Sequence, residues 1–258
     1  MSGAWPTIKV NGPDVFRRED EIAEEFPLTI RLDGEEFATL VCSPSDLEDL
    51  VVGFLASEGV ILTAEDIREM SLDEERGFAY VNLHRPQSTG KDFYSKRLIG
   101  SCCGKSRQFY FHNDARTAKT VTGGINVTAA DCFAYMRLLQ ENSADFRLTG
   151  GVHNAALCRD GELVEARSDI GRHNALDKIF GHCLRHRIPA KNHAIAFSGR
   201  LSSEVVLKAA KIGSAVLLSK SAPTDLALRL AEDLGITCAG FIRGGSMNIY
   251  THPHRILL

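Results

Sequence analysis

The sequence of 258 residues has no long uninterrupted hydrophobic run, no secretory leader pattern and no regular cysteine spacing. A membrane-spanning helix needs roughly 18 to 20 apolar residues in a row, and each apolar stretch here is broken sooner by a charged residue or a glycine. The first twenty residues contain no apolar segment after a basic start, which argues against a secretory signal. Seven cysteines, an odd number, do not fit a secreted disulfide framework, so we expect a cytoplasmic protein.

Several ligand-binding signatures are absent as well. The chain contains neither a Walker A phosphate loop nor a Gly-x-Gly-x-x-Gly fingerprint, so an ordinary NTPase or Rossmann fold lacks support. It also lacks two cysteine pairs at zinc-binding spacing, and adjacent cysteines cannot easily supply two ligands of a tetrahedral zinc. His182 and His186 are four residues apart and could hold a metal on one helical face, but the pattern offers no third ligand. We therefore expect no tightly held metal.

Positive charge is scarce in the first part of the chain. Residues 1–150 contain 16 Lys and Arg against 24 Asp and Glu, whereas residues 151–258 contain 14 against 9 and also seven of the nine histidines. Although the net charge of the whole chain is −3, residues 151–258 are net positive. This uneven distribution of charge favours an anionic ligand in the second part of the chain. The basic residues are spread over loops, which favours a small anion over nucleic acid.

The first part of the chain predicts a small α+β region. Its first 25 residues are polar, contain Pro and Gly, and are expected to wrap the surface. Two segments of alternating apolar residues at 27–32 and 35–42, joined by an Asp-Gly turn, predict a β-hairpin. A capping-box pattern at 45–48 predicts a helix that ends near residue 58. Thr128 predicts the start of another helix that runs through about residue 140.

Beyond a polar patch at 142–145, the pattern changes to strands that alternate with helices. The patch divides the chain into an N-terminal α+β region at 1–145, which includes the cysteine pair described below, and a C-terminal domain at 146–258. The expected strands are 152–158, 162–167, 193–197, 215–218, 236–241 and 247–250. The expected helices are 173–186, 202–212 and 224–234. This alternation predicts an α/β layered domain with a largely parallel sheet.

Four loops of the C-terminal domain combine a basic residue with Ser, Thr or Gly. These loops are 168–174, 198–203, 219–224 and 241–246, and their basic residues are Arg172, Arg200, Lys220 and Arg243. Ligands of such sheets bind at the carboxyl ends of the strands, and three of these loops open a helix whose free N–H groups favour phosphate. One such loop could be an ordinary capped turn, but four at one edge favour a polyphosphate or nucleotide-like ligand.

Two histidines of the same domain are candidate general acids or bases. His153 follows a glycine pair at the start of an expected strand, and His173 begins an expected helix, where Asp169 or Asp177 could orient its ring. A buried, hydrogen-bonded histidine without a chemical role is an equally good interpretation of either position. His252 and His254 flank a proline near the C-terminus and are expected on the surface or facing a ligand.

The stretch 97–107 contains two adjacent cysteines, Cys102 and Cys103, between two glycines. Lys105 and Arg107 follow closely, and nearby cations lower the pKa of a thiol and raise the thiolate fraction. A glycine-rich turn with two idle thiols is the alternative to a mobile, nucleophilic sulfur. A cysteine hydrolase would need a base, which the sequence does not place nearby. Sulfur carriage, in which a thiolate accepts a sulfur as a persulfide and hands it on, suits a basic loop best.

Five segments together resemble the FdhD family, the formate dehydrogenase accessory sulfurtransferases. They are GSCCGK at 100–105, TGGVHNAA at 149–156, DIGRHNALDK at 169–178, SKSAPT at 219–224 and RGGSMNIYTHP at 243–253. The resemblance extends in order from about residue 25 to the end of the chain. Family members often carry Cys-x-x-Cys before Gly-Lys, whereas here Gly100 stands at the first cysteine position.

The resemblance implies a fold, a function and partners. The fold is α/β (α+β overall), with a C-terminal cytidine-deaminase-like layered domain and a smaller N-terminal α+β domain. The protein takes sulfur as a persulfide from a cysteine desulfurase and passes it to the bis(molybdopterin guanine dinucleotide) molybdenum cofactor, which formate dehydrogenase requires. It also implies a homodimer. From the spread of the basic residues and the lack of long apolar runs, we expect no nucleic-acid or membrane partner. The zinc signature of deaminases, His-x-Glu with Pro-Cys-x-x-Cys, is absent.

The resemblance assigns roles to particular residues. Cys103, directly before Gly104, carries the persulfide, and Cys102 is a relay or resolving thiol, although physical chemistry alone does not decide between the two. The family's cofactor-binding segment is Phe241, Ile242, Arg243, Gly244, Gly245 and Ser246, and we add Arg172, His173, Arg200 and Lys220 from the basic loops. Two rival functions stay open: a nucleotide-directed hydrolase or deaminase that uses His153, His173 and Asp169, and a non-catalytic molybdenum-cofactor chaperone.

Overall fold

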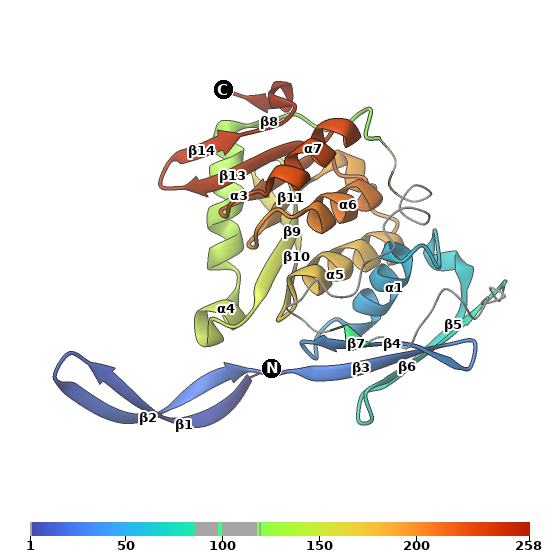
Figure 1. The fold of residues 1–258 in the computed structure, drawn as a ribbon, viewed down its shortest axis with the longest axis vertical. Helices are drawn as coiled ribbons and strands as arrows, with labels where there is room; N and C mark the ends of the chain where they lie inside the picture. Colours follow the sequence, from blue (N-terminus) through green and yellow to red (C-terminus); the bar gives the residue numbers. More distant parts are fainter. Residues whose placement is uncertain (1, 86–97, 100–117, 119) are drawn as a thin grey trace.

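The computed structural model describes residues 2–85, 98–99, 118 and 120–258 (Figure 1). The predicted nucleophiles, Cys102 and Cys103, lie outside the described residues. Within the described part of the chain, no helix is both long enough and apolar enough to cross a membrane.

A five-stranded sheet forms one outer layer of the molecule. Its strands are β3 (Phe26–Leu32), β4 (Glu35–Cys42), β5 (Ile67–Asp73), β6 (Phe78–Leu83) and β7 (Leu98–Ile99), in the order β5-β6-β3-β4-β7. The predicted hairpin is confirmed, because β3 pairs antiparallel with β4 and Leu32 lies opposite Glu35. Asp33 and Gly34 both have positive φ, as a two-residue turn of this hand requires.

A six-stranded sheet holds the C-terminal part of the chain. Its strands are β9 (His153–Arg159), β10 (Glu162–Asp169), β11 (Ala194–Phe197), β12 (Val216–Ser219), β13 (Thr237–Arg243) and β14 (Ser246–Ile249), in the order β10-β9-β11-β12-β13-β14. The expectation of a largely parallel sheet is wrong, because only β11–β12 and β12–β13 pair in parallel. Two-residue turns join β9 to β10 and β13 to β14, and so short a connection can only join antiparallel strands.

Helices cover both faces of the six-stranded sheet (Figure 1). The helices are α1 (Leu47–Ser57), α3 (Ala129–Glu141), α4 (Ala144–Thr149), α5 (Arg172–Arg185), α6 (Ser203–Ile212) and α7 (Asp225–Leu234). Along β9, Ala155 and Leu157 join the core under α5 and α6, whereas Ala156 and Cys158 join the core under α3. Helices α1 and α5 pack between the two sheets in one shared core.

Of the two helix caps predicted from the sequence, one forms and the other does not. Thr128 caps α3 as predicted, with its Oγ1 accepting from Asp131 N at 3.0 Å. The capping box predicted at 45–48 does not form, and the N-cap residue Asp46 has a φ of 50° and no side-chain capping bond. The Ser45 hydroxyl instead accepts a hydrogen bond from Lys178 Nζ of α5 at 3.4 Å. A tertiary contact has replaced the local one.

The residues around the predicted domain boundary form a helix that the sequence did not predict. This short helix, α4, covers residues 144–149, and the preceding helix α3 packs on the six-stranded sheet. The division into 1–145 and 146–258 stays a prediction, as does the likeness of the C-terminal part to cytidine deaminases.

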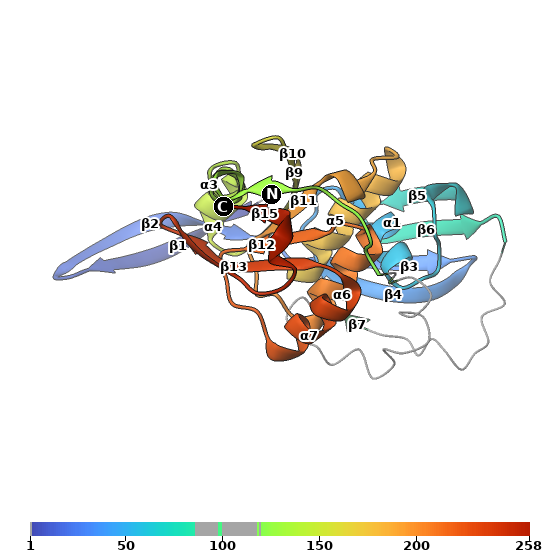
Figure 2. The same cartoon turned by 90° about the horizontal axis from the view of Figure 1, so that it is seen from above.

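The first residues do not wrap the surface as the sequence predicted. Instead, β1 (Ser2–Asn11) and β2 (Asp14–Ala23) form a hairpin that extends away from the body (Figures 1 and 2). Two short strands, β8 (Val127–Thr128) and β15 (Ile256–Leu257), pair in parallel.

Candidate functional site

The candidate site lies where three parallel strands end. The carboxyl ends of β11, β12 and β13 meet at one edge of the six-stranded sheet. Because β9 runs antiparallel to β11, its first residue, His153, lies at the same edge. β10 runs antiparallel to β9 and brings Asp169 opposite His153. The edge therefore collects residues from five strands.

The four basic loops predicted from the sequence are neighbours at this edge. His173 Nε2 of the first loop lies 3.0 Å from Glu204 in the first turn of α6. Ser219 Oγ of the third loop donates to the carbonyl of Gly199 in the second at 2.8 Å. Phe241 N of the fourth loop donates to the Ser221 carbonyl of the third at 3.2 Å. Glu204 directly follows the second loop, so these contacts link all four loops at one edge of the sheet, as the sequence predicted.

Three buried polar atoms of the edge have no hydrogen-bond partner in the described part of the chain. They are Arg172 Nε, His173 Nδ1 and Ser202 Oγ, all at the N-terminal ends of α5 and α6. Neither helix start has a side-chain capping bond. Unpaired buried polar atoms are costly, and helix N-termini carry partial positive charge. The combination suits an anionic ligand with several acceptor oxygens.

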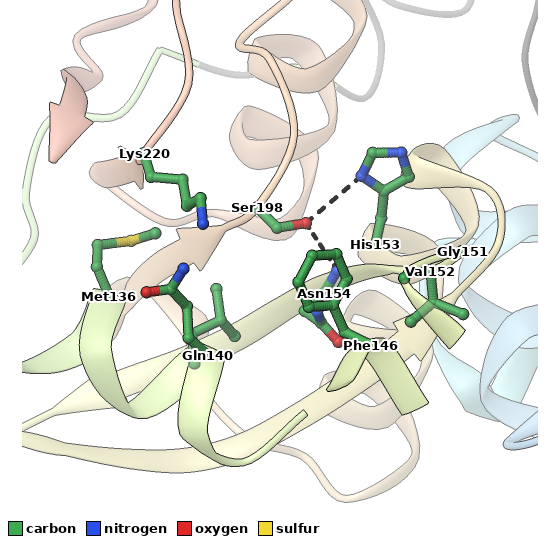
Figure 3. A pocket seen from close by; sticks show the side chains of 11 residues that line it. Met136, Gln140, Phe146, Gly151, Val152, His153, Asn154, Ser198 and Lys220 are labelled. Atoms are coloured by element: carbon green, nitrogen blue, oxygen red, sulfur yellow. Dashed lines mark hydrogen bonds between the residues drawn. The ribbon is translucent and has the colours of Figure 1, made fainter. Parts of the chain in front are cut away.

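A cavity of about 220 Å³ opens beside His153 (Figure 3). The edge supplies His153, Ser198 and Lys220, while α3 and α4 supply an opposite wall that includes Gln140 and Phe146. Ser198 Oγ accepts from Asn154 N at 2.9 Å and lies 3.5 Å from His153 Nδ1. Burial lowers the pKa of His153 below its usual 6.5, and the electrostatic influence of the neighbouring Arg172 and His173 lowers it further. A neutral imidazole therefore faces the cavity.

The segment Phe241–Ser246 forms the end of the β13–β14 hairpin. The strand bulges between Gly240 and Arg243, and Phe241 adopts a φ of 54°, which is unusual for a bulky residue. Gly244 and Gly245 both have positive φ and make the two-residue turn. Ile242 is buried, whereas Arg243 through Ser246 are exposed, with the Arg243 guanidinium 5.9 Å from the centre of the Phe241 ring. The turn presents an arginine and open backbone to solvent.

We compared the chain with protein-family models, with known proteins and with solved structures. A model of the FdhD/NarQ family matches residues 23–257. The chain belongs to the FdhD/NarQ family. Among its relatives, the sulfur carrier protein FdhD of Geobacillus kaustophilus (strain HTA426) is 61% identical over 98% of this chain and 96% of its own length. The protein of the same name from Bacillus subtilis (strain 168) is 54% identical over 94% of this chain and 93% of its own length.

A solved structure shares the fold of this FdhD/NarQ family member. The crystal structure of a proposed formate dehydrogenase accessory protein from Desulfotalea psychrophila superposes with a TM-score of 0.80. It is 26% identical and covers 99% of both chains. The similarity extends over the five-stranded sheet, the six-stranded sheet and the helices between them.

One predicted partnership in the FdhD/NarQ site is wrong. Neither Asp169 nor Asp177 orients the ring of His173, because Glu204 takes that position. Asp169 is fully buried 2.8 Å from Lys178 Nζ and also accepts from the backbone N–H of Ser43 and of Gly171. Asp177 is buried with Lys208 and with the Ser57 hydroxyl. Both aspartates are buried in ion pairs with lysines, so Asp169 is not placed to act on a substrate.

The histidine pairs outside the edge have structural partners. The rings of His182 and His186 are 4.3 Å apart, and His182 lies among Arg167, Asp49 and Glu165. The described residues contain no cluster of three or more His, Cys, Asp or Glu that could hold a metal ion. The C-terminal pair fits the surface alternative: His254 is exposed, and the ring of His252 contacts the Glu232 carbonyl in the last turn of α7 at 2.9 Å.

The sequence interpretation did not single out Glu204, Gln140 or Phe146. Glu204 follows Ser202-Ser203 at a helix start, where an acidic residue is ordinary, so nothing local points to His173 as its partner. Gln140 comes from α3, on the other side of the predicted boundary from His153, and Phe146 comes from α4, which spans that boundary. Only the packing of α3 on the sheet brings them to the cavity.

Proposed function

We propose that this chain is a cytoplasmic sulfur carrier for formate dehydrogenase maturation. It accepts sulfur as a cysteine persulfide from a cysteine desulfurase and passes it to the bis(molybdopterin guanine dinucleotide) molybdenum cofactor, which is its substrate. Membership of the FdhD/NarQ family supports this role, and relatives at 54–61% identity carry the name sulfur carrier protein.

The burial of the five described cysteines supports the choice of the Cys102–Cys103 pair as the sulfur-carrying site. The five cysteines in the described part of the chain are Cys42, Cys132, Cys158, Cys183 and Cys238, and all are buried. Burial raises the pKa of each thiol to about 12, so almost none is thiolate at neutral pH. Cys102 and Cys103 are the other two of the seven, and Lys105 and Arg107 follow them in sequence. We assign the persulfide to Cys103.

The loop edge is the proposed substrate site. The guanine dinucleotide carries diphosphates, and Arg172, Arg200, Lys220 and Arg243 are donors that pair with phosphate oxygens. The unpartnered Arg172 Nε and Ser202 Oγ fit the same acceptors. His173, held by Glu204, presents Nδ1 beside them. The uncapped N-termini of α5 and α6 add favourable dipoles, so the residues present fit an anionic dinucleotide.

The transfer begins as a thiol–persulfide exchange. The Cys103 thiolate attacks the terminal sulfur of the donor persulfide, the donor S–S bond breaks, and the donor leaves as a thiolate. Cys103 then holds the terminal sulfur and presents it to the molybdenum of the substrate bound at the loop edge. Cys102 serves as a relay or resolving thiol.

The thiol assignment is tested by mass spectrometry after incubation with a cysteine desulfurase and cysteine. Wild-type protein should gain the mass of one sulfur atom on the peptide that contains Cys103. Cys103→Ala should abolish the gain, while Cys102→Ala, the matched neighbour, should retain it. Full labelling of C103A would overturn the assignment to Cys103. A C102A/C103A variant that still yields active formate dehydrogenase would favour the non-catalytic chaperone instead.

The substrate site is tested with GDP, which carries the guanine and diphosphate of the substrate. In calorimetric titrations, Arg172→Gln, Lys220→Gln and Arg243→Gln should each weaken GDP binding by about tenfold, because each removes a charge-assisted hydrogen bond. Arg76→Gln, at an exposed position between β5 and β6, is the matched control and should bind like wild type. Equal affinities for all four variants would exclude this edge as the nucleotide site.

A further inference from the structure

Glu204 places a carboxylate among the basic loops of the candidate site. It lies in the first turn of α6, and its Oε2 is 3.0 Å from Nε2 of His173 in the first turn of α5. The two helices pack against each other (Figure 1), so this contact joins their N-terminal ends. Acidic residues are ordinary at helix starts, but a carboxylate beside an anion site repels the ligand unless its charge is offset.

The contact with Glu204 decides which nitrogen of His173 carries a hydrogen. In a neutral imidazole one ring nitrogen donates and the other accepts, whereas in the imidazolium both donate. An ionised carboxylate only accepts, so Nε2, which faces Glu204, must carry a hydrogen. In the neutral ring Nδ1 is then a bare acceptor. This buried atom has no hydrogen-bond partner in the described part of the chain.

The polar groups near Nδ1 indicate what a ligand there must offer. Arg172 Nε and Ser202 Oγ are buried and unpartnered at the same two helix starts. Arg172 Nε can only donate, and the uncapped N-termini of α5 and α6 add backbone donors. The ligand must therefore bring acceptor oxygens. A bare acceptor at His173 Nδ1 repels such oxygens, whereas a protonated Nδ1 donates to them.

The charged groups around His173 favour that proton only when an anion is present. Arg172 and the N-terminal dipole of α5 both oppose a second positive charge there. His153 of β9 also faces this region, but burial lowers its pKa and keeps its ring neutral. Asp169 of β10 is already paired with a buried lysine. Glu204 favours the charged ring, and a bound diphosphate adds negative charge on the Nδ1 side.

We propose that Glu204 is a positioning residue that holds His173 with a hydrogen on both ring nitrogens when a diphosphate binds, so that binding takes up a proton from solution. The Glu204 carboxylate accepts from Nε2–H, and the new Nδ1–H donates to a phosphate oxygen. The imidazolium and the carboxylate then form a neutral pair that no longer repels the anion. This inference rests on the nucleotide site of the proposed function and adds a pH dependence to it.

Calorimetry with GDP-mannose counts the protons. The diphosphate of this probe is esterified at both ends, as in a guanine dinucleotide, and does not titrate near neutral pH. Titrations at pH 7.5 in buffers of different ionisation enthalpy should show an uptake of about 0.5 proton or more per site in the wild type. Glu204→Gln, which keeps an acceptor for Nε2 but loses the negative charge, should reduce the uptake to near zero. His173→Gln should do the same.

The pH profile and the sign of the affinity change separate this role from simple repulsion. Wild-type affinity should fall by about tenfold from pH 6.5 to pH 8.5, because the bound state holds the extra proton, whereas the affinity of E204Q should change little. Removing a carboxylate that only repels the anion would tighten binding. E204Q should instead weaken it by about fivefold at pH 6.5, because a charge-assisted hydrogen bond is lost.

Two control variants should keep the wild-type proton uptake. Asp225→Asn removes an exposed acid from the first turn of α7, directly after the third basic loop, and touches no histidine in the described part of the chain. His153→Gln removes the other histidine of the edge, whose ring is already neutral.

The contrary outcomes distinguish this inference from the proposed site. Wild-type uptake in E204Q, tighter binding by E204Q, or loss of uptake in H153Q would each overturn the role of Glu204 and leave the nucleotide site standing. A wild-type protein that does not bind GDP-mannose would overturn both.

Discussion

At the residue scale, the buried pair of Asp169 and Lys178 connects the candidate site to the core. Both side chains have 0% exposure, and their charged atoms are 2.8 Å apart. Lys178 Nζ also donates to the Ser168 and Ser43 carbonyls, and Asp169 accepts from Asn174 Nδ2. The pair thus ties the loop before α5 to the strand that ends at Cys42. Its role is to hold the edge in place.

Breaking this pair should be costly. Lys178→Met should lower the free energy of unfolding by about 3–5 kcal/mol, because it leaves the buried Asp169 carboxylate without its countercharge. Urea denaturation measures the loss. Lys191→Met, at an exposed position, is the matched control and should change little. Adding D169N to K178M should recover part of the stability, and a double variant worse than K178M would contradict the electrostatic explanation.

The lowered pKa of His153 predicts a pH dependence of stability. Below about pH 6.5 the unfolded chain binds a proton at His153 more readily than the folded chain does, so the free energy of unfolding falls as the pH decreases. His153→Gln should flatten this dependence when urea midpoints are compared from about pH 7 down to about pH 5. His182, whose pKa is lowered by burial and by Arg167, keeps part of the slope in the variant. An unchanged slope would mean that His153 titrates alike in both states.

At the element scale, the crossing of α1 and α5 joins the two parts of the chain. A Cβ on Gly53 of α1 would lie 1.7 Å from the Asp177 carbonyl oxygen. A Cβ on Gly181 of α5 would lie 1.8 Å from the Asp49 carbonyl oxygen. The two glycines therefore let the helix backbones touch. Asp49 adds polar contacts at the same interface, with Arg167 at 2.8 Å and Arg185 at 2.6 Å.

Either glycine should be intolerant of a methyl group. Gly53→Ala and Gly181→Ala should each cost about 3 kcal/mol or more, because the obstacle is backbone and only a shift of the whole helix relieves it. Gly123→Ala is the control, since its Cβ would meet nothing within 4 Å. Differential scanning calorimetry measures the three variants. A G53A protein as stable as wild type would show that the helices can separate without cost.

At the scale of the whole molecule, one core is shared by both sheets. The cluster that contains Leu28 and Leu40 of the five-stranded sheet also contains Leu157 and Leu217 of the six-stranded sheet, with α1 and α5 between them. Apolar burial is the dominant favourable contribution to folding. Neither sheet can therefore lose its packing without exposing the other.

The shared core predicts a single cooperative unfolding transition. Leu28→Ala and Leu217→Ala, in different sheets, should each lower the free energy of unfolding by about 2–5 kcal/mol and shift the same transition. Circular dichroism during urea titration, with hydrogen exchange on residues of both sheets, reports the result. Two separate transitions, of which L28A shifts only one, would contradict the prediction.

The sequence by itself determined the local elements and the chemistry available to them. Alternating apolar residues and the Asp33-Gly34 turn predicted the β3–β4 hairpin, and Thr128 predicted the start of α3, because these signals act within a few residues. The basic loops were also predictable, since each follows a strand and most open a helix. The four loops meet as expected because parallel strands end at one edge.

Only the tertiary structure decided which partners these elements take. Glu204 in place of an aspartate beside His173, and Lys178 in place of a local cap at Ser45, are contacts between segments far apart in the chain. The antiparallel strands of the six-stranded sheet and the protruding β2 arise in the same way. Backbone preferences extend over a few residues, whereas strand order and side-chain pairing depend on how whole faces are buried. That is why local elements such as the β3–β4 hairpin and α3 could be predicted, whereas most contacts between distant segments could not.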